Sequence, residues 1–421
     1  MIALCDVNNF YVSCERLFDP TLIGRPCLVL SGNDGCAIAR SNEVKSLGIK
    51  MGAPLHEIKH LVKQHNIAIK SSCFPLYGDM SHRVDAIIDT YCHATENYSI
   101  DESWMDYSTG YHHLNLVKHN QQMVKQIQQW LGLPVCVGLA PSKTLAKIAN
   151  YWAKKLKIPG SVLQLNNEYH VKEALKYLPV DEIWGVGRRL STKLNQMGIT
   201  TALDLYQADA KTMRKRFSVL MERTILELRG ISCIDFDADP EKKKQIICSR
   251  SFGKKLEDFD SIVEAMVYHV SRGAQKLREQ KSKARSLLIG ITTNGFSKTD
   301  KQYRNSINLQ LPEHTSDTTH FVNAARIGLK KIFKSGFKYK KVSIMYQDLC
   351  DQDAVQGNLF DPFPQSTQSN ELMGVLDGIN SRFGKGVVRI ASEGFNRGWE
   401  MRANHKSPAY TTRLSDIISV R

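Results

Sequence analysis

Hydrophobic and polar residues follow two periods along this chain, and each period predicts a different kind of element. Short apolar runs predict strands over residues 2–7, 28–30, 36–39 and 134–139. Apolar residues at helical spacing predict helices over residues 40–47, 77–91, 114–131 and 142–157. Their succession favours an α/β layer with antiparallel strand pairing and helices on one face of the sheet.

The second half of the chain arranges strands and helices in another order. The pattern predicts strands at 246–252, 286–292, 306–311 and 341–346 and helices at 261–280 and 321–333. This order predicts a separate β-α-β-β-α-β domain. A polar linker at 236–245 precedes it, and the Gly-rich C-terminal residues predict a tail that is weakly ordered or ordered by a partner.

Composition changes the picture mainly through charge. The net charge is +15, and residues 242–349 alone hold 22 basic against 9 acidic side chains. Such clustering is typical of a surface that binds a polyanion, nucleic acid being the common case. We expect the four-stranded sheet of this domain to present a basic face that lies along a duplex. A basic surface that serves only solubility is the alternative.

Other bulk properties exclude several classes of protein. A length of 421 residues favours roughly three or more domains. No unbroken apolar stretch is long enough for a membrane span, and the first residues lack the basic leader of a signal peptide. The ten scattered cysteines contain no C-x-x-C pair, which disfavours a zinc ribbon or a disulfide framework. We therefore expect a protein of the reducing cytoplasm.

Acidic residues at the ends of two strands are the strongest chemical signal. Asp6 closes the first apolar run, and Asp101 and Glu102 follow another short apolar approach. Carboxylates brought side by side bind hard divalent cations. The nearby Asp106 has no ligand's role in this pattern.

Lysines and a turn accompany these acids. Lys143, Lys147 and Lys154 share one face of the helix predicted over 142–157, a row that suits a triphosphate. Solvated lysines that serve solubility are an equal alternative. Residues 6–11 (Asp-Val-Asn-Asn-Phe-Tyr) predict a turn that directs backbone N–H groups and two rings toward Asp6, or a plain Asx-turn before two core aromatics.

Two glycines indicate a helix–hairpin–helix. Gly185 and Gly187 separate two segments of helical spacing, so the tight turn and the following helix start would present N–H groups to a DNA phosphate. A Rossmann loop is excluded because no strand precedes the glycines.

Residues 56–60 match the H-E-x-x-H zinc motif by sequence alone. His56 and His60 lie one helical turn apart, with Glu57 in the position of the base. The next histidine, His65, does not fit the longer metzincin pattern. A polar helix face is the better interpretation, and a zinc metalloprotease is the minor alternative.

Several of these features occur together in one known family. They are residues 6–11, Ser-Ile-Asp-Glu at 99–102, the lysine helix 142–157, the Gly-Val-Gly hairpin at 185–187 and Arg-Ser-Phe-Gly at 250–253. In this order and over essentially the whole chain they resemble the Y-family translesion DNA polymerases. The spacing of these motifs narrows the likeness to one bacterial branch of that family. Residues 246–251 and the tail indicate the same branch.

The resemblance implies an α+β, multidomain, right-handed polymerase. Its parts would be a palm (1–11 and 74–165), small fingers (12–73), a helical thumb with the helix–hairpin–helix (166–235), a linker (236–245), a β-α-β-β-α-β little finger (246–349) and a C-terminal tail (350–421). The implied activity is template-directed, error-prone DNA synthesis across lesions, by nucleotidyl transfer, during the SOS response to DNA damage in the bacterial cytoplasm.

The resemblance also assigns site residues. Asp6, Asp101, Glu102 and the carbonyl of Val7 would hold two Mg²⁺ ions as catalytic metals. The dNTP would contact Phe10, Tyr11, Lys45 and Lys154, with Tyr11 as a steric gate against a ribose 2′-hydroxyl. Primer–template DNA would contact Gly185, Gly187, Arg188, Arg250 and Ser251.

Implied partners are a UmuD′ homodimer, RecA and the β sliding clamp. The clamp would bind a short motif with Gln356, Leu359 and Phe360, in which Gly357 replaces a commoner Leu. Two further departures are Asn42, where many relatives have Tyr, and Ser103, where the family usually has Ala.

A catalytically inactive adaptor that binds DNA and the clamp is the alternative. Such a protein would be expected to have lost an acid at position 6, 101 or 102, and all three are present.

Overall fold

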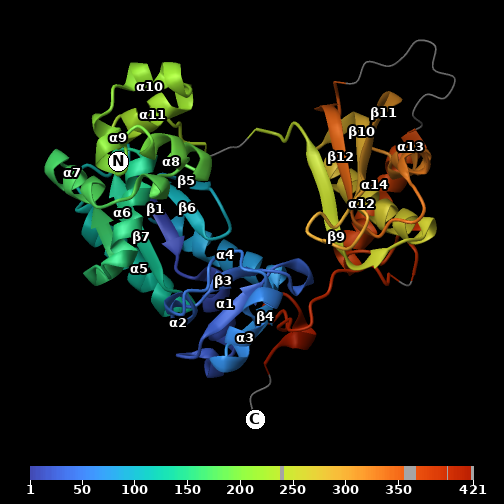
Figure 1. Ribbon diagram of the computed structural model, residues 1–421, viewed down its shortest axis with the longest axis horizontal. Coiled ribbons are helices and arrows are strands. Elements are labelled where there is room, and N and C mark those ends of the chain that lie inside the picture. The colour runs from blue at the N-terminus through green and yellow to red at the C-terminus, as the bar shows by residue number, and fades with distance from the viewer. Residues whose placement is uncertain (238–240, 355–366, 396, 419–421) are drawn as a thin grey trace. The chain divides into compact units, whose positions relative to one another are not determined.

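The computed structural model describes residues 1–237, 241–354, 367–395 and 397–418. The chain forms two compact units, whose elements are labelled in Figure 1. Unit 1 comprises residues 1–31, 35–240 and 405–421, and unit 2 comprises residues 32–34 and 241–404.

A five-stranded sheet with the order β5-β6-β1-β7-β8 organises unit 1. Its strands are β1 (Ile2–Val7), β5 (Ala94–Asn97), β6 (Glu102–Asp106), β7 (Val135–Ala140) and β8 (Val162–Gln164). The surrounding helices are α1 (Phe10–Phe18), α4 (Phe74–Ile88), α5 (Leu116–Leu131) and α6 (Lys143–Lys155). All neighbouring strands are antiparallel except β7 and β8, which are parallel.

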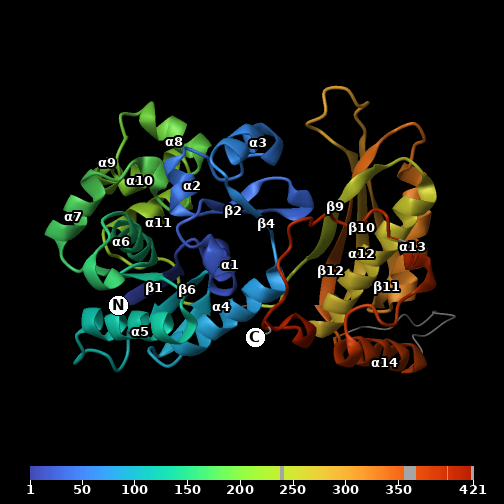
Figure 2. The same cartoon turned by 90° about the horizontal axis from the view of Figure 1, so that it is seen from below.

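Helices cover both faces of this sheet, so the prediction of helices on one face is wrong. Ala3, Cys5 and Val7 of β1 belong to the core formed with α4 and α5. Leu4, which points to the other face, belongs to the core formed with α6. Figure 2 shows the sheet between α6 and the pair α4 and α5. The physical reason is that β7 is buried at every position and therefore needs cover on both sides.

Two smaller parts complete unit 1. A three-stranded sheet carries two short helices, namely β2 (Cys27–Leu30), β3 (Ala37–Arg40), β4 (Ala68–Ser71), α2 (Asn42–Ser46) and α3 (Leu55–Gln64). A helical segment follows β8 and shares a core with α6; its helices are α7 (Glu168–Lys176), α8 (Arg188–Asn195), α9 (Ala202–Gln207), α10 (Ala210–Arg216) and α11 (Val219–Leu228).

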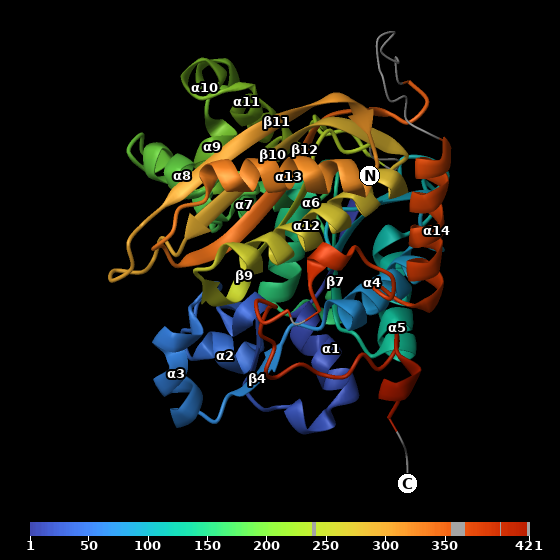
Figure 3. The same ribbon diagram turned by 90° about the vertical axis from the view of Figure 1, so that its right-hand side faces the viewer.

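Unit 2 confirms the predicted β-α-β-β-α-β order. Its elements are β9 (Ile246–Leu256), α12 (Phe259–Glu279), β10 (Ser282–Thr293), β11 (Arg304–Thr315), α13 (Thr318–Ile332) and β12 (Tyr339–Asp351). The strand order is β11-β10-β12-β9, and all neighbours are antiparallel. Figure 3 shows α12 and α13 on one face of this sheet.

The tail is more ordered than its composition predicts. In unit 2 it forms α14 (Thr367–Phe383) and buries Trp399. In unit 1 the Ser407 hydroxyl donates to the carboxylate of Glu15, and the ring of Tyr410 stacks on Phe18 with 4.9 Å between ring centroids. The expectation of a weakly ordered tail is therefore wrong for these residues, because a few apolar and hydroxyl side chains within it find buried partners.

No helix in the described ranges is long and apolar enough to span a membrane. All ten cysteines are free thiols.

Candidate active site

Two of the predicted acids meet directly across a pair of strands. Asp6 near the end of β1 lies opposite Glu102 at the start of β6 in the antiparallel register. Asp101 precedes Glu102 in the tight turn from β5, and its carbonyl accepts the Val7 N–H at 2.9 Å. The acids therefore sit at one strand end and one strand start, rather than at two strand ends, because the two strands run in opposite directions.

Helix α6 is held against this end of the sheet by one buried amide. The Asn150 side chain donates to the Cys136 carbonyl at 2.7 Å and to the Leu4 carbonyl at 3.3 Å. A Cβ at Gly138 would lie 2.1 Å from the Ala146 carbonyl oxygen, so only glycine permits this close approach. The anchored helix directs the residues one turn before and after Asn150 toward the acids.

Those residues are two of the three predicted lysines. Lys154 forms an ion pair with Asp6, and Lys147 forms one with Glu102 at 2.8 Å. Lys143 does not join the row. Its ammonium is buried and lies 2.5 Å from Glu96 and 2.8 Å from the Asp235 carbonyl. The prediction of three outward lysines is thus wrong for Lys143, whose charge is used to join the sheet to the chain after α11.

The electrostatics of Asp6 reflect the crowding of acids. The pKa of Asp6 is raised from its ordinary 3.8 to about 6, mainly by burial and also by the neighbouring Glu102 and Asp101, whereas Lys154 opposes the rise. A second cation beside Asp6 would relieve this repulsion. The site therefore favours positively charged ligands over anionic ones at the acids themselves.

Aromatic rings that the sequence analysis did not assign surround Lys147. Its ammonium lies 4.5 Å from the centroid of Tyr98 and 5.4 Å from that of Trp184. The Trp184 indole N–H donates to the Tyr98 hydroxyl at 3.0 Å. The sequence signal that could have revealed Trp184 is its position directly before the hairpin glycines, because this residue links the hairpin to the acids. A cavity of about 310 Å³ adjoins Asp6, Glu102, both lysines and Trp184.

The turn after β1 brings several predicted nucleotide contacts to the same place. Asn9 adopts a left-handed backbone, with φ of +50°, which Asn tolerates better than most residues. Its side-chain oxygen accepts from Lys45 at 2.6 Å. Tyr11 is half-buried and stacks on Tyr77 with centroids 4.6 Å apart, whereas the ring of Phe10 is buried in the core. Burial and the Asp101 charge raise the pKa of Tyr11.

The donor set suits hard cations, although the acids are held by lysines here. Across the described residues, no three His, Cys, Asp or Glu side chains converge closely enough to form a ready metal centre. Two carboxylates lie in direct register, a third lies beside them, and the pKa of Asp6 is raised. Divalent cations would relieve this crowding of negative charge. The residues present therefore fit the predicted metal ions.

Ser103 has a packing role. Its hydroxyl donates to the Asp85 carboxylate of α4 at 2.7 Å, which ties β6 to that helix. His56 and His60 are exposed on α3, so the interpretation as a polar helix face is confirmed for that motif.

The predicted DNA contacts fall into two groups, one in each unit. Gly185 has a φ of +87°, and Gly187 is the N-cap of α8, as a helix–hairpin–helix requires. Arg188 is the first residue of α8. In unit 2, Arg250 and Ser251 are adjacent on β9 and therefore point to opposite faces of the sheet.

The open face of the unit 2 sheet is less basic than expected. One row across its four strands consists of Ser249, Ser343, Gly290 and Ser306, and the next consists of Ser251, Lys341, Thr292 and Arg304. Strand alternation makes these two rows mostly small and polar, with Lys341 and Arg304 as their basic side chains, and α12 and α13 carry six further basic side chains. The expectation of a basic sheet face is corrected accordingly. The predicted clamp contacts Gln356, Leu359 and Phe360 lie outside the described residues.

Family models match most of the chain. The impB/mucB/samB family matches residues 5–151, its C-terminal domain matches 243–359, and the IMS family HHH motif matches 170–199. Residues 370–420 match a domain of unknown function.

Named relatives match along the full length. Protein UmuC of Salmonella typhimurium strain LT2 is 40% identical over 100% of both chains, and Protein MucB of Escherichia coli is 39% identical over 99% of both. DNA polymerase IV of Desulfatibacillum aliphaticivorans is 25% identical over 93% of this chain and 96% of its own.

Solved structures share the fold. The Y-family DNA polymerase chimera Dbh-Dpo4(243-245)-Dbh superposes with a TM-score of 0.65 at 17% identity, over 83% of this chain and all of the other. The insertion ternary complex of Dbh DNA polymerase gives a TM-score of 0.53 at 18% identity, with the same coverage.

Proposed function

The chain belongs to the impB/mucB/samB family of Y-family DNA polymerases, and from this premise we propose that it copies damaged DNA in the SOS response. It is a DNA-directed DNA polymerase of the UmuC type. The bacterial branch that the sequence indicates, that of UmuC and its relatives, is thereby confirmed.

The single observation that carries the proposed chemistry is the Asp6–Glu102 register with its two lysines. Two Mg²⁺ ions held by Asp6, Asp101, Glu102 and the Val7 carbonyl would activate the primer 3′-hydroxyl and neutralise the triphosphate. In the free protein, Lys154 is ion-paired with Asp6 and Lys147 with Glu102. When released from the acids, their ammonium groups can contact phosphate oxygens, so that positioning and charge neutralisation accelerate the transfer.

Further contacts follow from where the side chains lie. Tyr11 is the proposed steric gate, because its ring is fixed by stacking on Tyr77 beside the acids. Lys45 lies within the electrostatic reach of Asp6 and Lys154, which supports a role toward the triphosphate. The hairpin with Gly185, Gly187 and Arg188 and, in unit 2, Arg250 and Ser251 of β9 are the proposed DNA contacts.

We place the protein in the bacterial cytoplasm, with a UmuD′ homodimer, RecA and the β sliding clamp as proposed partners. The support is its UmuC-type kinship and ten free thiols, which suit a reducing compartment.

Primer extension across an abasic template site tests the proposal. The full chain, with Mg²⁺, dNTPs and the proposed partners, should insert opposite the lesion, and Asp101→Ala/Glu102→Ala should not. Asp106→Ala is the matched control, since it removes an acid from the far end of the same strand. Equal extension by wild type and the double variant would overturn the metal site. Extension by neither, with DNA binding intact, would favour the inactive adaptor.

A further inference from the structure

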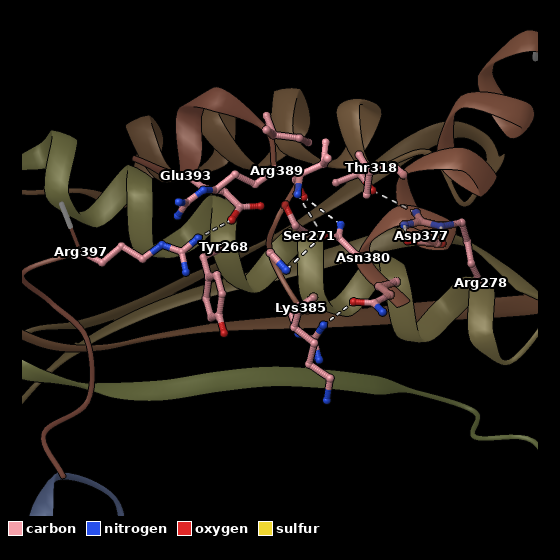
Figure 4. Close-up of a pocket in the computed structure, with 16 residues that line it drawn as sticks. Tyr268, Ser271, Arg278, Thr318, Asp377, Asn380, Lys385, Arg389, Glu393 and Arg397 are labelled. Atoms are coloured by element: carbon pink, nitrogen blue, oxygen red, sulfur yellow. Dashed lines mark hydrogen bonds and ion pairs between the residues drawn. The ribbon is translucent and has the colours of Figure 1, made fainter. Parts of the chain in front are cut away.

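The part of the tail that matches a domain of unknown function builds half of a cavity in unit 2. The cavity has a volume of about 150 Å³ and lies between α12 and residues 376–397. Figure 4 shows Arg278 and Asp377 at one end, Arg397 and Glu393 at the other, and Tyr268, Ser271 and Lys385 between them. None of these residues belongs to the proposed polymerase site.

The α12 wall is a polar stripe along one side of the helix. Tyr268, Ser271, Arg272, Gln275 and Arg278 line the cavity at spacings of three and four residues. The opposite stripe of α12, which includes Met266 and Leu277, is fully buried in the core of unit 2. The polar stripe is therefore the face of α12 that the tail covers.

Basic side chains outnumber acids around the cavity by five to two. The cations are Arg272, Arg278, Lys385, Arg389 and Arg397, and the acids are Asp377 and Glu393.

Both acids are already committed. Asp377 holds Arg278 through two contacts of 2.6 and 2.8 Å, and the third guanidinium nitrogen of Arg278 donates to the Ser316 carbonyl and the Thr318 hydroxyl. Glu393 is buried and holds Arg397 at 2.8 Å. These two pairs close the ends of the cavity and leave no negative charge for the remaining cations.

Three cations consequently share one cavity without a carboxylate partner among the residues that the structure describes. Arg272 donates to the side chain of Gln275, and Arg389 lies 5.5 Å from the ring of Phe395. Lys385 is exposed at the rim. Like charges gathered in this way repel one another unless an anion lies between them. The buried Nε of Arg397, which lines the same cavity, also has no hydrogen-bond partner in the described residues.

The loop that carries Lys385 and Arg389 is fixed in place. The Asn380 side-chain oxygen accepts the N–H groups of Gly386 and Val388 at 3.1 Å each, and its amide donates to the Val388 carbonyl at 2.8 Å. One side chain of α14 thus satisfies three backbone groups of the loop. Cations on a fixed loop lose less conformational entropy on binding than cations on a mobile one.

We propose that this cavity binds a phosphate group. Its volume is below the roughly 300 Å³ at which pockets for whole small molecules begin, so it suits one anionic group rather than an entire nucleotide. An excess of three positive charges matches an oxyanion with several oxygens that accept hydrogen bonds. Guanidinium groups bind phosphate through paired donors. The phosphate can belong to the backbone of a nucleic-acid strand or to a free phosphate compound.

Hydrogen exchange of the full chain, followed in peptides that cover residues 376–397, tests the proposal. The three probes are inorganic phosphate, an unprimed single-stranded oligonucleotide and an oligoglutamate peptide. Phosphate should slow exchange in a saturable manner. Protection by the oligonucleotide at a much lower concentration identifies a strand backbone as the source, whereas protection by phosphate alone identifies a free phosphate compound.

Charge-neutral variants complete the test. The variant Arg272→Gln/Lys385→Gln/Arg389→Gln should raise the phosphate concentration that gives half-maximal protection, the phosphate midpoint, about tenfold or more. The control Lys276→Gln/Arg326→Gln/Lys330→Gln removes the same charge from exposed positions on α12 and α13 and should change it less than twofold. If the first variant does not unfold cooperatively, Arg389→Gln alone should raise the midpoint at least threefold. Absence of protection, equal protection in the variant, or protection only by oligoglutamate overturns the proposal.

Discussion

Asp6 and Glu102 are direct partners across the antiparallel pair β1 and β6, although 95 positions separate them in sequence. Side chains of directly opposed residues lie on the same face of a sheet, so these two carboxylates must share their surroundings. Their ion pairs with Lys154 and Lys147 let both acids exist in one place without metal ions. The same pairs explain why α6 has to be anchored so closely to β7.

The titration of Asp6 should be visible in stability. Its pKa is raised from 3.8 to about 6, so between these pH values the native state binds more protons than the unfolded state. The free energy of unfolding contributed by this group therefore falls as pH rises through that window. Without Mg²⁺, wild type should lose about 1 kcal/mol relative to Asp6→Asn between about pH 5 and pH 7. Urea denaturation at both pH values measures this, and a relative gain for wild type would contradict it.

Sugar selection should depend on the ring of Tyr11. Tyr11→Ala opens space beside the acids and should admit ribonucleotides about a hundredfold better relative to deoxyribonucleotides. Tyr11→Phe keeps the ring and its stacking on Tyr77, so it should retain selection. The ratio of kcat/KM for dCTP and CTP measures this on an undamaged template. Unchanged selection in Tyr11→Ala would mean that another residue is the gate.

The tail should stabilise Tyr77, the residue on which the ring of Tyr11 stacks. Ser407 and Tyr77 both donate to the buried carboxylate of Glu15, the latter at 2.5 Å. Ser407→Ala leaves one carboxylate oxygen without its donor, which should cost about 1–3 kcal/mol of unfolding free energy.

Ser415→Ala is the matched control, since it removes an exposed hydroxyl from the same tail. Because Tyr77 supports Tyr11, Ser407→Ala should also weaken sugar selection. Equal stability of the two serine variants in denaturant titrations would show that the Glu15 contact contributes nothing.

Substitutions of Lys154 and of its neighbour Lys155 should have sharply different effects on the KM for dNTP. Lys154 reaches Asp6, whereas Lys155 is exposed and lies against the rings of Tyr151 and Trp152. Lys154→Gln should raise the KM for dNTP about tenfold, because it removes a charge from the proposed triphosphate site. Lys155→Gln should leave KM within twofold. Similar effects of both changes would point to general charge rather than a defined contact.

Local sequence patterns predicted most of the helices and strands, and they identified the three acids as a candidate metal site. The apolar run of residues 2–7 matches β1 at both ends, and the stripe on residues 142–157 matches α6 within two residues. These features depend on periodicity that neighbouring residues carry. The resemblance to a polymerase family then assigned roles that periodicity could not.

Long-range pairing was beyond the sequence. Lys143 has the same helical spacing as its two companions, and only the position of Glu96 on β5 removes it from the row. The tail could not be judged from composition, because single residues such as Ser407 decide its docking. The phosphate cavity likewise depends on which acids are already paired.

Single-turnover insertion of a correct dNTP at saturating Mg²⁺ tests the central claim most directly. The experiment compares Asp6→Asn, Glu102→Gln and the control Asp106→Asn on one primer–template. We predict that the first two lose about a thousandfold or more in rate, since they remove metal-binding oxygens at the reacting centre, and that the control stays within about twofold. Rates for Asp6→Asn and Glu102→Gln equal to that of Asp106→Asn would contradict the account.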